Sequence, residues 1–112
     1  MKNIKALLIF CLICFISSKA VAQKDTLIVK SSVNCATCKK TIESGLRFEK
    51  GVQKATVDYH KKTVTIIYRS DKTDAGQLRL AISNLGYNAD TIAAKPDAYN
   101  KLPACCKAGG HD

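Results

Sequence analysis

The chain has 112 residues, 46% of them apolar and 24% charged, and its 18 Lys and Arg residues outnumber its 9 Asp and Glu residues. A chain of this length buries one modest core, which suits a single small domain and excludes a large multi-domain enzyme. The formal net charge of +9 does not indicate nucleic-acid binding. The cationic residues after residue 22 are scattered, with Lys39-Lys40 and Lys61-Lys62 as their only adjacent pairs.

The first 22 residues follow the order that is typical of a secretory signal peptide. Two lysines within residues 1–5 precede the apolar run Ala6–Ile16, and Ala20 and Ala22 provide small residues for cleavage after Ala22. A run of 11 apolar residues is too short for a membrane-spanning helix, which needs about 20. We therefore expect residues 1–22 to be removed and the mature chain to be exported, to the periplasm or out of the cell. Loss of three lysines lowers its formal net charge to +6.

Two kinds of periodicity follow each other at the start of the mature chain. Thr26–Lys30 is rich in strand-forming residues and predicts a first strand. From Ala36 the buried positions recur at steps of three and four, which predicts a helix. The residues on its predicted inner face are Cys38, Ile42, Gly45 and Leu46. Gly51 stands where a helix C-cap is expected.

The next segment predicts a hairpin and a second helix. Ala55–Tyr59 and Thr63–Arg69 alternate apolar with polar residues, and His60–Lys62 between them indicates the hairpin tip. Asp74–Gln77 resembles a capping box, which predicts a helix start. Gly86 is placed to end this second helix.

A short last strand over Tyr87–Ala93 completes the order strand, helix, strand, strand, helix, strand. This order predicts the ferredoxin-like α+β fold, in which two helices cover one face of a four-stranded antiparallel sheet. In that topology the loop before Cys35, the hairpin around His60 and the Gly86-Tyr87 corner share one end of the sheet. Residues 95–112 have little apolar patterning and predict a flexible, cysteine-containing tail.

The four cysteines of the mature chain come in two close pairs, Cys35 with Cys38 and Cys105 with Cys106. Close pairs of this kind suit metal capture or redox exchange better than structural cross-linking, because a vicinal disulfide is strained. Cys35 and Cys38 stand at the predicted start of a helix, where the helix dipole favours thiolates. Two thiolates satisfy a two-coordinate ion such as Cu(I), the first candidate, or Hg(II), and they also bind Zn(II) or Cd(II).

The tail provides candidates for further ligands. Cys105 lies twelve positions after Ala93, enough to span about 40 Å when extended. The tail could therefore fold back, so Cys105, Cys106 and His111 are candidate accessory ligands. It could equally hold a separate site or make no contact with the domain. We expect His60, at the hairpin tip, to be a solvated surface residue.

The run from Val33 to Cys38, Val-Asn-Cys-Ala-Thr-Cys, with Ile42 and Leu46 beyond it, resembles the heavy-metal-associated domain family. The resemblance extends over about residues 25–93, and we expect the domain to occupy residues 23–94. It implies a ferredoxin-like fold with Cys35 and Cys38 as metal ligands. The family's usual loop has Met where this chain has Val33, which keeps an apolar anchor for the loop. Gly86-Tyr87 matches the Gly-aromatic pair that copper-chaperone relatives place beside the metal loop, so Val33 and Tyr87 are expected to support the ligands.

The resulting hypothesis is an exported carrier or scavenger of soft metal ions that is not an enzyme. The partners implied are the metal ion and a membrane metal transporter or another metal-binding domain, with no nucleic acid. The alternative is a thiol–disulfide oxidoreductase that uses the same two cysteines. Against it, residues 23–94 contain no proline to supply the cis-proline that such enzymes place beside their disulfide. An RNA-recognition module is disfavoured because Thr63–Tyr68 lacks the Gly-aromatic pattern needed for base stacking.

Overall fold

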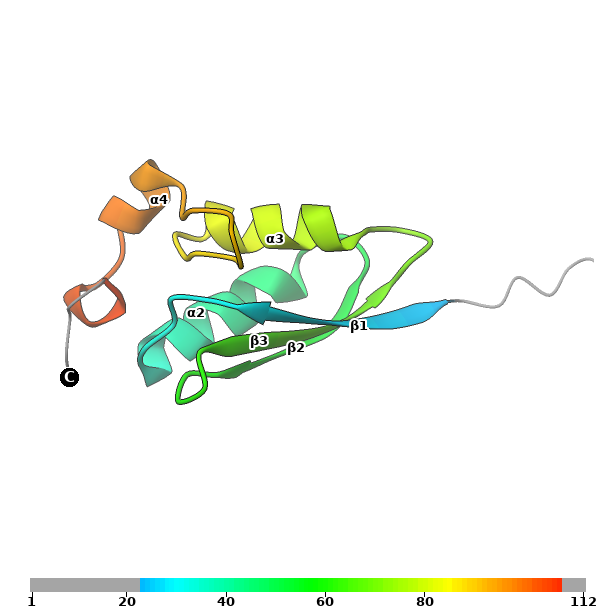
Figure 1. The fold of residues 1–112 in the computed structure, drawn as a ribbon, viewed down its shortest axis with the longest axis horizontal. Helices are drawn as coiled ribbons and strands as arrows, with labels where there is room; N and C mark the ends of the chain where they lie inside the picture. Colours follow the sequence, from blue (N-terminus) through cyan, green and yellow to red (C-terminus); the bar gives the residue numbers. More distant parts are fainter. Residues whose placement is uncertain (1–22, 108–112) are drawn as a thin grey trace, which may run out of the picture.

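The computed structural model describes residues 23–107. The predicted signal peptide, residues 1–22, and the candidate ligand His111 lie outside these described residues. Figure 1 shows the elements in chain order: β1 (Lys24–Lys30), α2 (Ala36–Arg47), β2 (Val52–Asp58), β3 (Thr63–Arg69), α3 (Ala75–Asn84), α4 (Pro96–Asn100) and the short 3-10 helix η1 (Ala104–Cys106). None of the helices in this part of the chain is both long and apolar enough to cross a membrane.

The three strands form one antiparallel sheet with β3 in the centre, in the order β1-β3-β2. Val64 of β3 lies opposite Val29 of β1 on one side and Val57 of β2 on the other. All three side chains are buried in the core, because residues directly opposite one another on neighbouring strands lie on the same face of the sheet. The predicted hairpin, with His60 at its tip, and the strand predicted from the alternating residues of Thr63–Arg69 are thus confirmed.

Helices α2 and α3 cover one face of the sheet and close a single core (Figure 1). Their fully buried residues are Cys38, Ile42, Leu46, Leu78 and Ile82. Helix α3 begins at its predicted cap, since the Asp74 carboxylate accepts the backbone N–H of Gln77 at 2.8 Å. A side chain at Gly45 would bring its Cβ to 2.7 Å from a methyl carbon of Leu85, so this glycine permits the close approach of the two helices.

The predicted fourth strand over Tyr87–Ala93 does not form, and the sheet in the described residues has three strands. Only Ala89 makes a β-bridge to the chain after β1, at Ser31, and Ala89 also bridges Ile92 three residues on. The segment turns back at Asp90, whose φ is +53°. The Asp90 carboxylate accepts the backbone N–H of Lys30 at 2.9 Å, a hydrogen bond between residues 60 positions apart in the sequence.

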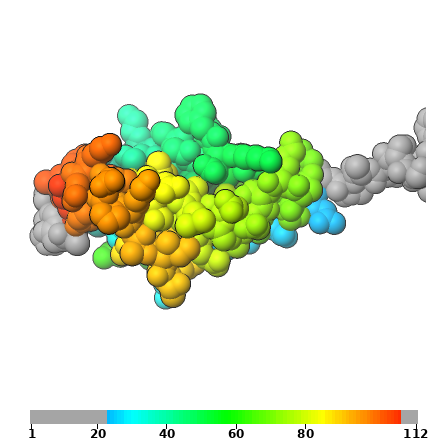
Figure 2. Space-filling view, turned by 90° about the horizontal axis from the view of Figure 1, so that it is seen from above, coloured from blue at the N-terminus to red at the C-terminus, as the bar shows by residue number. Residues whose placement is uncertain are grey.

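The residues after the domain also differ from the predicted flexible tail. Residues 95–107 contain α4 and η1, and the space-filling view shows them packed over one end of the domain (Figure 2). The backbone N–H of Lys95 donates to the carbonyl oxygen of Ser83 at 3.0 Å, which ties the segment to the end of α3. From α4 the chain returns to the N-terminal end of α2, where η1 contacts α2 (Figure 1).

Candidate metal centre

Cys35 and Cys38 stand at the start of α2, as their spacing predicts. Cys35 is the N-cap residue in an extended conformation, and Cys38 lies in the first helical turn. Because three residues are almost one turn of helix, the two side chains converge, and their Sγ atoms are 3.1 Å apart. Both side chains are buried, and both are free thiols.

The structure brings the second cysteine pair to the same place. The Sγ atom of Cys35 lies 3.3 Å from that of Cys105 and 3.5 Å from that of Cys106. Cys106 is only 2% exposed and belongs to the core, while Cys105 is half-buried. The sulfur atoms of Cys35, Cys105 and Cys106 all lie within 4.8 Å of one another, and each is a free thiol. Cys35 is therefore the common neighbour of the other three thiols.

Asn34 connects the first cysteine pair to the tail, a role that sequence reasoning missed. Its side-chain oxygen accepts from the Cys38 thiol at 3.3 Å, and its side-chain nitrogen donates to the carbonyl oxygen of Lys107 at 3.4 Å. The position of Asn34, immediately before Cys35, is the only sequence feature that could have pointed to it. One amide thus contacts the Cys-Ala-Thr-Cys turn and the end of η1 at once.

The electrostatics of the cluster favour a thiolate at Cys35. Burial alone would raise its pKa, but hydrogen bonds to its sulfur outweigh that effect and lower the pKa to about 7. These bonds come from the Cys38 thiol and backbone N–H and from the thiols of Cys105 and Cys106. The lowering therefore has its source inside the cluster, whereas Lys39 lies 3.8 Å from Glu43, its partner on the helix surface.

The tail thiols have the opposite tendency. The hydrogen bond that Cys105 makes with Cys35 is the largest effect that raises the Cys105 pKa. Burial, followed by the contact with Cys38, raises the pKa of Cys106 well above its ordinary value. In the metal-free cluster Cys35 thus ionises at a lower pH than Cys105 and Cys106.

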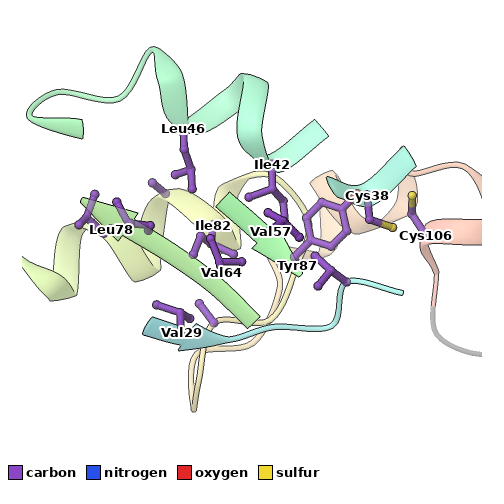
Figure 3. Close-up of a cluster of buried hydrophobic side chains, with 14 of the residues drawn as sticks. Val29, Cys38, Ile42, Leu46, Val57, Val64, Leu78, Ile82, Tyr87 and Cys106 are labelled. Carbon is purple, nitrogen blue, oxygen red and sulfur yellow. The ribbon is translucent and has the colours of Figure 1, made fainter. Parts of the chain in front are cut away.

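Tyr87 closes the inner side of the cluster. Figure 3 shows its ring grouped with Cys38 and Cys106 at one end of the core. Gly86, at φ +102°, turns the chain at the end of α3. The N–H groups of Gly86 and Tyr87 donate to the carbonyl oxygens of Ser83 and Ile82. This is the Schellman pattern, and it directs Tyr87 inward. Its buried hydroxyl makes no hydrogen bond within the described residues, and burial beside the Cys106 and Cys38 thiols raises its pKa.

Of the two remaining candidates, Val33 supports the site and His60 does not belong to it. Val33 is fully buried and belongs to the core, as expected for an anchor of the loop before Cys35. His60 is exposed, and its ring packs against that of Tyr59 with the centroids 4.4 Å apart. The group of candidate metal ligands found among the described residues does not include His60.

Comparison with known proteins gives three informative relatives. A copper-exporting P-type ATPase of Bacillus subtilis (strain 168) is 32% identical over 84 residues, which are 75% of this chain and 10% of the ATPase. The mercuric transport protein periplasmic component of Shewanella putrefaciens is 31% identical over 84 residues, which are 74% of this chain and 92% of that protein. Among solved structures, the CopZ metallochaperone matches with a TM-score of 0.56 at 29% identity, over 58% of this chain and 98% of that chain.

These relatives agree with the geometry of the described residues. The match to CopZ confirms the α+β ferredoxin-like architecture, although the sheet within residues 23–107 has three strands instead of four. Residues 28–88 match the sequence model of the heavy-metal-associated domain, and this match contains Cys35, Cys38 and Tyr87 but ends before the tail. The chain therefore belongs to the heavy-metal-associated domain family.

Proposed function

We propose that this protein is an exported carrier or scavenger of a soft metal ion, which it binds through the thiolates of Cys35 and Cys38. The observation that carries the proposal is their convergence at the N-terminus of α2, with Sγ atoms 3.1 Å apart. The pKa of about 7 at Cys35 supports it, because the thiolate is the form that binds metal. Cu(I) is the first candidate, since soft thiolates select it, and Hg(II) is the second.

The protein is not an enzyme, because it belongs to a non-catalytic family of metal-binding domains. This finding also removes the thiol–disulfide oxidoreductase alternative. The relatives are parts of copper-exporting ATPases and small metal-handling proteins. They support a partner of the same class, a membrane metal transporter or a second metal-binding domain.

Metal transfer would proceed by stepwise exchange of thiolate ligands. An incoming thiolate bonds to the ion, and one of the protein's own thiolates then leaves it, so that the ion always keeps at least two sulfur ligands. Such exchange needs no net redox change. Export is supported by the signal-peptide pattern of residues 1–22 and by the relative from Shewanella, whose name places it in the periplasm.

Substitution of the two cysteines tests the proposal directly. Cys35→Ser and Cys38→Ser should each weaken Cu(I) binding by at least about a hundredfold, a loss of roughly 2.7 kcal/mol, while the fold stays intact by circular dichroism. Thr37→Ser is the matched control, because it changes a residue between the two cysteines without removing a thiol. Affinities should be measured on reduced protein by competition with a Cu(I) chelator. Unchanged affinity in the Cys35→Ser, Cys38→Ser double variant would reject the proposal.

A further inference from the structure

We infer that Cys105 and Cys106 join Cys35 and Cys38 in a four-thiolate site that also accepts a tetrahedral divalent ion such as Zn(II) or Cd(II). This inference rests on the proposed metal-binding function and extends it to a second class of ion. The match to the family ends at residue 88, so the tail thiols are an addition to the domain that the family describes.

Four of the six sulfur–sulfur distances are close to those of such a site. Four sulfur atoms around one Zn(II), each about 2.3 Å from the metal in tetrahedral geometry, are about 3.8 Å from one another. In the structure the sulfur of Cys35 lies 3.1 to 3.5 Å from the other three, and the sulfur atoms of Cys105 and Cys106 are 3.9 Å apart. The Sγ atom of Cys38 lies outside the group of three sulfur atoms that are within 4.8 Å of one another. Its side chain therefore has to move toward Cys105 and Cys106 before all four thiolates can bind one ion.

The tail is held in position by contacts that do not involve sulfur. The Asn34 side chain donates to the carbonyl oxygen of Lys107. On the other side, the backbone of Ala98 in α4 approaches Gly86 so closely that a Cβ there would lie 3.0 Å from it. Because these contacts place η1 against α2 without a metal, the ligands are preorganised, and little conformational entropy is lost when the ion binds.

Coordination chemistry explains why the additional thiols change the class of ion. Two thiolates satisfy Cu(I), but Zn(II) sites in proteins are almost always four-coordinate. Cys35 and Cys38 alone would leave such an ion two ligands short. The buried Cys106 and the half-buried Cys105 supply them from a single turn of η1. Cys105, the most exposed of the four thiols, is the one that an incoming ligand reaches first.

The test compares two ions on the same reduced protein. The double variant Cys105→Ser, Cys106→Ser should lose at least about a hundredfold in Cd(II) affinity and less than about tenfold in Cu(I) affinity. Co(II), used as a spectroscopic probe for Zn(II), should give the intense absorption of a tetrahedral thiolate complex in the unmodified protein and lose it in the variant. Ala104→Ser, an exposed position in η1, is the matched control and should behave as the unmodified protein does.

The outcomes separate this inference from the proposed function. Unchanged Cd(II) affinity and Co(II) absorption in the Cys105→Ser, Cys106→Ser variant would overturn the four-thiolate site and leave Cu(I) binding by Cys35 and Cys38 standing. If the Cys35→Ser, Cys38→Ser variant loses both Cd(II) and Cu(I) binding while the Cys105→Ser, Cys106→Ser variant keeps both, the four-thiolate site is likewise overturned and the proposed function stands. If circular dichroism shows that the Cys105→Ser, Cys106→Ser variant does not fold, the single variant Cys105→Ser replaces it in the test, because the Cys105 side chain is half-exposed. The Co(II) absorption of this variant should fall to that of a three-thiolate complex.

Discussion

Cys35 and Cys106 are separated by 71 positions in the chain, yet their Sγ atoms lie 3.5 Å apart. Both residues are 2% exposed. The contact joins the N-cap residue of α2 to the last residue of η1, so it closes the tail over the Cys-Ala-Thr-Cys turn. The candidate metal centre is thus assembled from two segments that lie far apart in the sequence.

The tail should depend on the glycine that ends α3. Gly86 has a φ of +102°, and a Cβ there would lie 3.0 Å from the backbone of Ala98. Gly86→Ala should therefore lower the free energy of unfolding by about 1–3 kcal/mol and loosen α4. Urea denaturation measures the first effect, and faster alkylation of the buried Cys106 thiol measures the second. Gly76→Ala, within helix α3, should change stability by less than about 1 kcal/mol, and an equal effect at both glycines would contradict this account.

The Asn34 amide should couple the first thiol pair to the tail. Asn34→Ala removes the contacts to the Cys38 thiol and to the Lys107 carbonyl oxygen. We expect a loss of about 1 kcal/mol in stability and a more reactive Cys106. Ser32→Ala is a useful comparison, since Ser32 bonds the backbone of Asn88 instead of the tail. It should lower stability by a similar amount and leave Cys106 protected; equal reactivity in the two variants would argue against the coupling.

One thiol of the reduced, metal-free protein should ionise near neutral pH. The pKa of Cys35 is lowered to about 7, while those of Cys105 and Cys106 are raised above the ordinary thiol value. The ultraviolet absorbance of thiolate should therefore rise by the amount of one thiol as the pH increases through about 7. Cys35→Ser should abolish this step and Ala104→Ser should keep it. A first step only above the ordinary thiol range would show that the hydrogen bonds do not offset burial.

The Asp90 carboxylate should make the free energy of unfolding depend on pH in the acidic range. The backbone N–H of Lys30 and then the Arg79 guanidinium hold the pKa of the Asp90 carboxyl below its ordinary value of 3.8. The ionised form thus stabilises the fold above pH 3.8, and this contribution is lost as the pH falls through the lower folded-state pKa.

Asp90→Asn tests the charge without disturbing the backbone, because Asn tolerates the positive φ of +53°. At neutral pH the variant should be less stable by about 0.5–1 kcal/mol, as expected for a partly exposed ion pair. The difference between the two proteins should vanish at pH values well below 3.8. A difference that persists in acid would assign the effect to the side-chain shape and not to its charge.

The sequence by itself determined the elements that depend on contacts between residues close together in the chain. Thr63–Arg69 forms a strand with Val64 and Ile66 inward because alternate side chains share a face of the sheet. Cys35 and Cys38 converge because a helix brings residues three apart to one side. The helix cap at Asp74 could likewise be predicted from the sequence, since its partner Gln77 is only three residues away.

Tertiary structure alone decided the features that depend on distant partners. The segment Tyr87–Ala93 has strand-forming residues, but Asp90 bonds to Lys30, 60 positions earlier, and the chain turns instead of extending. The tail carries no apolar periodicity, and its position depends on contacts with distant residues at Gly86 and Asn34 and on the burial of Cys106 in the core. The approach of Cys105 and Cys106 to Cys35 followed from those contacts and not from the spacing of the cysteines.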